Sequence, residues 1–433
     1  MQNPPKTDFF SQRLISLPDD WLIPAAFILG LLPSGVFVSI LLLIVLVIRR
    51  KSLEALGGLV LVVLANPAIF KTNGIEVFRY LPLLCGLIFM RPGLKIISVF
   101  VAWSLALLAT LLLFNGLVVS SLPSISLFKA TLFLGVLWVL FNTQRVDFEA
   151  FASRLDRFIP LFLLFNIPAY FFHTIGFARN GTGFQGLMNQ PQAFGVTAAL
   201  FATWLLYRMW TRSVFISVPI TVLTIIGLLG CILLSGARTS LLGFSVSFII
   251  MWLIQMLRSS KSLGLKILMT IIIGGISLFA FTTNTALTGF LFKNSSAENI
   301  LDAADTSRGS LVRRSLENFE DHPLLGVGFG TPSLVDAADI TYAPIVGLPI
   351  SVALEKGVWF SATLEEQGVV GTTALLIFFV SLIIYSIHNK TYLGMVLLSF
   401  LLASNLGEMT MFSMGGLGLL QWLLVMTGLR IRS

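Results

Sequence analysis

Apolar runs long enough to cross a membrane recur along the whole chain, and they exclude most other folds. A transmembrane helix needs about 20 apolar residues, because lipid offers no partner for an unpaired backbone N–H or C=O group. Such runs fall near residues 22–48, 53–70, 78–90, 94–119, 126–141, 158–177, 191–207, 213–235, 239–257, 265–284, 368–387, 391–404 and 410–429. They predict an all-α polytopic membrane protein with about 12–14 transmembrane helices.

The composition supports this fold class and argues against a nucleic-acid-binding protein. The chain is 56% hydrophobic and 11% charged, whereas soluble domains carry about 25% charged residues. The net charge of +8 is then the bias of Lys and Arg toward cytoplasmic loops, not a surface for nucleic acid. Both cysteines lie in apolar runs and the three histidines are far apart, so no metal site and no cofactor is expected.

Basic residues follow every second apolar run, and this alternation orients the chain. By the positive-inside rule, the connections that carry them are cytoplasmic and the remaining connections face outward. The basic groups are Arg49–Lys51, Arg91 with Lys95, Arg145 to Arg157, Arg208 with Arg212, Arg258 to Lys266, Lys390, and Arg430 with Arg432. The outward connections are then 71–77, 120–125, 178–190, 235–238, 285–367 and 405–409.

One outward connection, 285–367, is long and polar and holds more than half of the 20 acidic residues. It divides the chain into an N-terminal transmembrane bundle (1–284), a large outer loop (285–367) and C-terminal transmembrane helices (368–433). Long connections without structure of their own are unusual. Residues 305–323 show helical spacing that stops at a proline, and the Gly-rich stretch 324–330 predicts a turn.

Arginines are scarce on the outward face, so those present are candidate ligand contacts. They are Arg179, Arg238, Arg308, Arg313 and Arg314. A guanidinium fork binds phosphate in a bidentate manner and stays charged at any working pH, which suits a lipid-linked phosphate or diphosphate. Arg238 also stands next to the predicted start of a helix, where free N–H groups favour anions. The structural alternative is that each arginine reaches to a lipid headgroup, with Ser235 and Thr239 capping two helices.

Carboxylates near the re-entry into the membrane are candidates for a general base, which needs to reach an acceptor hydroxyl. They are Glu355, Glu365 and Glu366, in the stretch "EKGVWFSATLEEQGVVG". Glu365 and Glu366 could instead cap the following span. Lys356 beside Glu355 is compatible with a solvated turn.

Three motifs occur in a characteristic order: "GTGFQGLMNQPQAFG" in an outer loop, "LLSGARTSLLGF" opening a span, and "SRGSLVRRSLENFEDHPLLGVGFG" in the large loop, which "LEEQGVVG" closes. In this order and topology the chain resembles the O-antigen ligase / O-antigen polymerase superfamily of bacterial inner-membrane proteins, over about residues 170–390. The N-terminal part resembles the family only as a string of spans.

The resemblance implies a multi-pass glycosyltransferase of the bacterial inner (plasma) membrane whose active site faces the periplasm. Its donor would be a glycan on undecaprenyl diphosphate and its acceptor another glycan, with membrane lipids and other polysaccharide-export proteins as candidate partners. The resemblance further implies inverting transfer without a metal or other cofactor. The proposed diphosphate-binding arginines of the family correspond to Arg238 and to Arg179 and Arg308, with Arg314 nearby on the same loop segment.

One departure bears on the type of reaction. Lipid A-core ligases of the family commonly carry a histidine shortly before the Glu-x-Gly signal, and "EKGVWFSATLEEQG" has none. This favours a polymerase of O-antigen or exopolysaccharide units over a ligase, with Glu355 or Glu366 as the base. A flippase for lipid-linked sugars is the alternative from another class. It would carry ionisable residues at mid-membrane, and only Lys129 and His173, both near span ends, come close.

Overall fold

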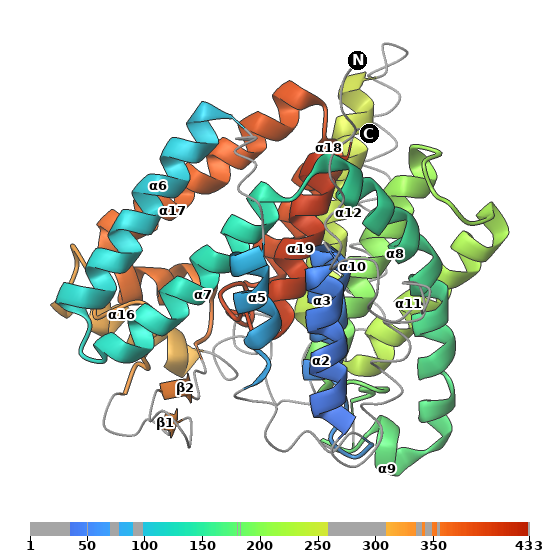
Figure 1. The fold of residues 1–433 in the computed structure, drawn as a ribbon, viewed down its shortest axis with the longest axis horizontal. Coiled ribbons are helices and arrows are strands. Elements are labelled where there is room, and N and C mark those ends of the chain that lie inside the picture. Colours follow the sequence, from blue (N-terminus) through green and yellow to red (C-terminus); the bar gives the residue numbers. More distant parts are fainter. Residues whose placement is uncertain are drawn as a thin grey trace, which may run out of the picture.

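The computed structural model describes residues 35–49, 51–69, 78–89, 98–179, 181, 183–258, 309–334, 340–342, 349–352 and 356–431. Over these residues it confirms an all-α polytopic fold (Figure 1). The helices are α2 (Gly35–Ile48), α3 (Ser52–Val63), α5 (Leu81–Phe89), α6 (Val99–Phe114), η1 (Asn115–Val119), α7 (Pro123–Asn142), α8 (Arg145–Asn166), η2 (Pro168–Phe171), α9 (His173–Gly176), α10 (Pro191–Trp210), α11 (Val218–Ser235), α12 (Arg238–Arg258), α16 (Ser310–Asp321), α17 (Trp359–Asn389), α18 (Tyr392–Ser404) and α19 (Leu417–Arg430).

Five of the described helical segments are long and apolar enough to cross a membrane. They are Val99–Val119, Pro123–Asn142, Val218–Ser235, Arg238–Arg258 and Trp359–Asn389, and the shorter apolar helices are Phe37–Ile48, Ser52–Val63, Tyr392–Ser404 and Leu417–Arg430. The predicted run 265–284 and the start of the run 22–48 lie outside the described residues. The number of 12–14 transmembrane segments therefore stays a prediction.

Helices α10 and α19 form the centre of the bundle. Both are apolar around most of their circumference, and such helices are stable only when other helices enclose them. Helix α10 packs against α11, α12 and α18, while α19 packs against α3, α7, α8 and α18. Trp204 and Trp422 are fully buried there. Large apolar side chains on peripheral helices, such as Trp103 on α6 and Leu223 on α11, point outward, as expected for a surface that faces lipid.

Helices α6 and α17 run side by side and lean away from the central helices (Figure 1). The hydroxyl groups of Ser104 and Ser381 share a 2.8 Å hydrogen bond between them. Helix α16 and a two-stranded hairpin lie near the lower end of this pair in Figure 1. The hairpin is antiparallel, with β1 (Ile340–Tyr342) opposite β2 (Pro349–Val352). The helical spacing in 305–323 is thus confirmed as α16, whereas the hairpin was not foreseen.

The basic ends of several helices meet at one end of the bundle. Arg208 pairs with Asp156 at 3.0 Å, and Arg154 pairs with Glu54. Arg258 stacks on Tyr392 at the start of α18, and Arg430 donates to the carbonyl of Phe141. We call this end the basic end and the opposite end, where α9, α16 and the hairpin lie, the loop end (Figure 1). The alternation of charge along the sequence is therefore matched by a spatial separation of the two ends.

Candidate functional site

Arg238 is the first residue of α12 and follows a tight turn at the loop end. Gly236 provides the left-handed conformation (φ 67°) that ends α11. The hydroxyl of Ser235 donates to Ile232 O at 2.7 Å and accepts from Ala237 N at 3.2 Å, so Ser235 caps the turn, as the structural alternative had it.

The guanidinium of Arg238 is half-buried, and among the interactions of the described residues it has no hydrogen bond or ion pair. Free N–H groups of the first turn of α12 add a partial positive charge beside it. The helix start and the guanidinium together leave an unused capacity for binding an anion.

The loop that carries Arg179 packs directly against this turn. Phe184 N donates to Leu234 O at 2.9 Å, and a Cβ atom at Gly183 would lie 2.8 Å from Ser235 O. Gln185 folds the loop by accepting from Arg179 N at 2.8 Å and donating to Met188 O at 2.9 Å. These bonds fix the described part of the loop, and the exposed side chain of Arg179 lies in the segment next to the Arg238 turn.

The loop between α18 and α19 (405–416) closes the same region from another side. Gly407 presses against Thr239, so that a Cβ atom at 407 would overlap the Thr239 methyl group. Asn405 O accepts from Trp359 N at 3.1 Å, which attaches the start of α17 to this loop. Four segments that are far apart in the sequence thus converge at the loop end: 183–185, 235–239, 359 and 405–411.

Two charged residues of this region were missed in the sequence. Glu408 lies in the α18–α19 loop and is partly exposed. Arg79 lies just before α5, with its Cζ 4.8 Å from the ring centre of Tyr80 and its Nε next to Gly415. The sequence held a signal for both, because Glu408 lies within the predicted outward connection 405–409 and Arg79 stands at the start of the apolar run 78–90.

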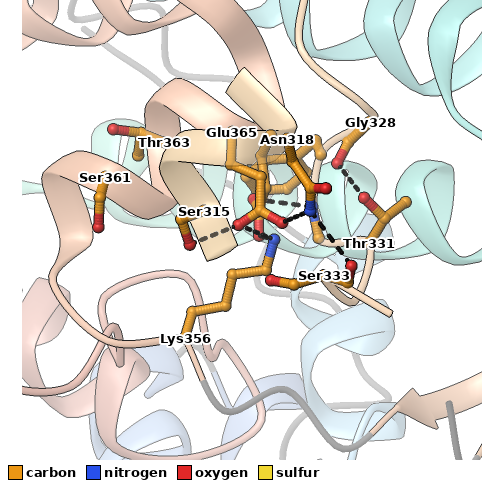
Figure 2. A network of polar contacts seen from close by, with 12 residues as sticks. Ser315, Asn318, Gly328, Thr331, Ser333, Lys356, Ser361, Thr363 and Glu365 are labelled. Atoms are coloured by element: carbon orange, nitrogen blue, oxygen red, sulfur yellow. Dashed lines mark hydrogen bonds and ion pairs between the residues drawn. The ribbon is translucent and has the colours of Figure 1, made fainter. Parts of the chain in front are cut away.

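A second group of charges is enclosed between α16, α17 and the segment before α17 (Figure 2). Glu365 and Glu366 on α17 are both 0% exposed. Lys356 Nζ lies 2.9 Å from Glu365 Oε2 and 3.3 Å from Glu366 Oε1. We call Lys356, Glu365 and Glu366 the buried ion cluster. Lys356 is therefore not in a solvated turn, and neither glutamate is only a helix cap.

Hydrogen bonds join the buried ion cluster to the large loop. Glu365 accepts from Ser315 Oγ at 2.8 Å and from Asn318 Nδ2 at 2.7 Å, both on α16. Glu366 Oε2 accepts from Gly330 N at 2.8 Å, and Lys129 Nζ of α7 donates to Gly330 O at 2.8 Å. Each carboxylate thus holds part of the loop against the membrane helices.

The Gly-rich turn 324–330 docks on a break in α17. Gly368 adopts φ 61° and ψ −167°, which interrupts the helical hydrogen bonds. The turn and its flanking residue replace them: Val327 N and Gly328 N donate to Glu365 O and Glu366 O at 2.9 and 3.0 Å. In return, Val369 N and Val370 N donate to Pro323 O and Leu324 O at 2.9 and 3.2 Å. The turn therefore completes the backbone of a membrane helix.

Alanine at Gly368 should destabilise the protein by about 2 kcal/mol or more, because a left-handed conformation is costly for a residue with a Cβ atom. That atom would also overlap the backbone of Leu324. Gly230→Ala in α11 is the matched control: it has no heavy atom within 4 Å of a new Cβ, and alanine favours helix over glycine. Thermal unfolding midpoints in detergent measure both. Equal midpoints would show that the break does not need glycine.

The candidate residues from the sequence fall into three groups. The segments of Arg238 and Arg179 are in contact, as described above. Arg314 is exposed on α16 beside buried Ser315, and Glu366 lies in the buried ion cluster. Arg308 and Glu355 lie outside the described residues.

Residues 223–351 match the family model described as O-Antigen ligase. This stretch of the chain is similar to the O-antigen ligase family. The match begins within α11, includes the Arg238 turn and α16, and ends in β2. The resemblance to the O-antigen ligase and polymerase superfamily is thereby confirmed. A comparison with curated proteins finds no match. The Arg238 turn and the docked Gly-rich turn thus both lie within the matched stretch.

Proposed function

We propose that the protein is a glycosyltransferase that polymerises O-antigen or exopolysaccharide repeat units. The donor is a glycan on undecaprenyl diphosphate, used at the periplasmic face of a bacterial inner membrane, without a metal ion. The observation that carries this proposal is the guanidinium of Arg238 at the start of α12, which has no partner among the described residues and lies within the stretch that matches the O-antigen ligase model. Its position at the end of an apolar helix is a suitable depth for a lipid-linked diphosphate.

The proposed role of the arginines is to stabilise the leaving group. As the bond between the anomeric carbon and the diphosphate oxygen breaks, negative charge grows on that oxygen, and a preorganised cation lowers the barrier. Arg238 and Arg179 supply this charge from adjacent segments. Arg308 and Arg314 are proposed as further contacts from the large loop, which orients the acceptor sugar. The acceptor hydroxyl attacks from the opposite face, so the configuration inverts.

The two glutamates proposed as base differ in what supports them. Glu355 lies outside the described residues. Glu366 is within 3.3 Å of Lys356 Nζ and has no exposed surface. A general base has to come within hydrogen-bonding distance of the hydroxyl that it deprotonates. Glu366 can therefore act as a base only in a state in which Lys356 has withdrawn from it.

Ligation to lipid A-core is the alternative acceptor reaction, and a flippase is the alternative from another class. A flippase would be expected to hold ionisable groups along a path through the membrane. Among the residues that the structure describes, the buried charged side chains lie at the two ends of the bundle: Glu54, Asp156 and Arg208 at the basic end, and Lys356, Glu365 and Glu366 at the loop end. This distribution favours the enzyme.

Deleting the gene separates the reactions. A polymerase predicts accumulation of single lipid-linked units, whereas a ligase predicts long polymer that stays unattached. In parallel, undecaprenyl diphosphate should raise the thermal unfolding midpoint of the purified protein in detergent. At a lipid concentration of 100 times Kd, the free energy of unfolding should increase by about 2–3 kcal/mol. Undecaprenol, which lacks the diphosphate, is the matched control. Equal midpoints with both lipids would contradict the proposed diphosphate site.

A further inference from the structure

Glu408 stands out as a charge in a stretch that is otherwise apolar. It is the acidic residue of the segment between Lys390 and Arg430, which has no other charged side chain. An ionisable side chain at membrane depth is costly and is usually kept for function. Glu408 is partly exposed, whereas Glu365 and Glu366 are fully buried.

The loop that carries Glu408 is held rigidly. Asn405 is fully buried, and its Oδ1 accepts from Thr410 N at 2.6 Å and from Met411 N at 2.8 Å. Trp422 Nε1 donates to Met411 O at 3.0 Å, which fixes the loop to α19. Thr410 N also donates to Glu408 O at 2.9 Å. Reactive groups need such support, because loosely held side chains lose productive geometry.

The loop places Glu408 next to the proposed diphosphate site. Its neighbour Gly407 packs against Thr239, which directly follows Arg238. At the other end of the same loop, Gly415 lies against the guanidinium of Arg79. The loop of Glu408 thus touches the segments of both arginines, and a carboxylate on this loop is well placed to act on the sugar side of an anionic donor.

The other described carboxylates at the loop end are placed differently. Glu365 and Glu366 are enclosed with Lys356 and hold the large loop. Glu317, Glu320 and Asp321 belong to α16, which packs against α17. Glu408 is the described carboxylate whose own segment contacts the first turn of α12.

We propose that Glu408 is a catalytic residue that accepts the proton of the acceptor hydroxyl. This inference rests on the proposed function and assigns the base of that reaction to Glu408 in place of Glu355 or Glu366. The acceptor O–H bond breaks and its proton moves to the Glu408 carboxylate, while the acceptor oxygen bonds to the anomeric carbon. The bond from that carbon to the diphosphate oxygen breaks, and its electron pair leaves on the diphosphate beside Arg238. The proton then returns to water.

Glu408→Gln tests the proposal, because glutamine keeps the shape and cannot take a proton. The assay uses membranes from the deletion strain, whose accumulated lipid-linked units serve as donor, and measures donor consumption by full-length variants. We expect the rate to fall by a factor of about 10²–10⁴, with undecaprenyl diphosphate still raising the unfolding midpoint as in the wild type. Glu408→Asp should recover part of the rate. Glu317→Gln, an exposed carboxylate on α16, should leave it unchanged.

The outcomes separate this inference from the function on which it rests. Normal turnover by Glu408→Gln overturns the inference and leaves the proposed function standing. Loss of both turnover and the response to undecaprenyl diphosphate also overturns it, because Glu408 would then serve binding or folding. A wild-type protein that neither consumes the donor nor responds to undecaprenyl diphosphate overturns the proposed function itself.

Discussion

Arg238→Ala should abolish polymer formation in cells that lack the wild-type gene. In membranes it should lower consumption of the lipid-linked glycan by a factor of about 10²–10³, the usual cost of removing one preorganised hydrogen-bond donor to a developing oxyanion. The physical reason is the position of Arg238. Its guanidinium has no partner among the described residues to compensate its charge, and it lies at the positive end of α12. Alanine removes the only full charge of that turn.

Arg238→Lys distinguishes a fork from a point charge. Lysine keeps the charge but loses the planar fork that meets two phosphate oxygens at once, so partial activity is expected, with weaker binding of undecaprenyl diphosphate. Arg157→Ala at the basic end is the matched control, since Arg157 is exposed and bonded to Ser153 of its own helix. Polymer of normal length and amount from Arg238→Ala would show that Arg238 only anchors the chain at the lipid headgroups.

Lys356→Met should lower the free energy of unfolding by about 3–5 kcal/mol, because it leaves two buried carboxylates without their shared cation. Both carboxylates are fully buried at 2.9 and 3.3 Å from Lys356 Nζ. Thermal unfolding of the purified protein in detergent measures the loss. Arg145→Ala breaks an exposed ion pair with Glu149 and should change stability by less than about 1 kcal/mol.

A triple variant separates lost charge balance from lost packing. Lys356→Met combined with Glu365→Gln and Glu366→Gln removes the whole buried ion cluster, and replacing a complete buried pair is often close to neutral. The triple variant should therefore be more stable than Lys356→Met alone. If Lys356→Met is as stable as Arg145→Ala, the cluster does not hold the large loop.

The fold class and the helix and turn within the large loop could be predicted from the sequence because each rests on a local pattern. Apolar length and the alternation of basic connections are read within short windows, and so are the helix α16 and the turn that follows it. The start of α17 could not be predicted in this way. The helix begins at Trp359 rather than near residue 368. The apolar pattern starts only after Glu365 and Glu366, and their burial becomes understandable only from the partners that enclose them in the structure.

The site is harder to predict because its parts meet through the backbone. The loop of Arg179 contacts the Arg238 turn through a hydrogen bond from Phe184 N to Leu234 O. Almost any residue type can make such a backbone hydrogen bond, so the sequence does not reveal it. Glu408 and Arg79 become candidate site residues only when the structure shows which segments lie beside them. The Gly-rich turn was recognised, but its partner in α17 was not, for the same reason.

The exchange of hydrogen bonds at Gly368 has a consequence for the modularity of the chain. Glu365 O, Glu366 O, Val369 N and Val370 N find their partners in residues 323–328, not within α17. In lipid, each such group without a partner costs several kcal/mol. The large loop is therefore not an appendage that could be trimmed or exchanged between relatives at its ends. It folds cooperatively with the bundle, and a graft would have to carry both halves of this joint together.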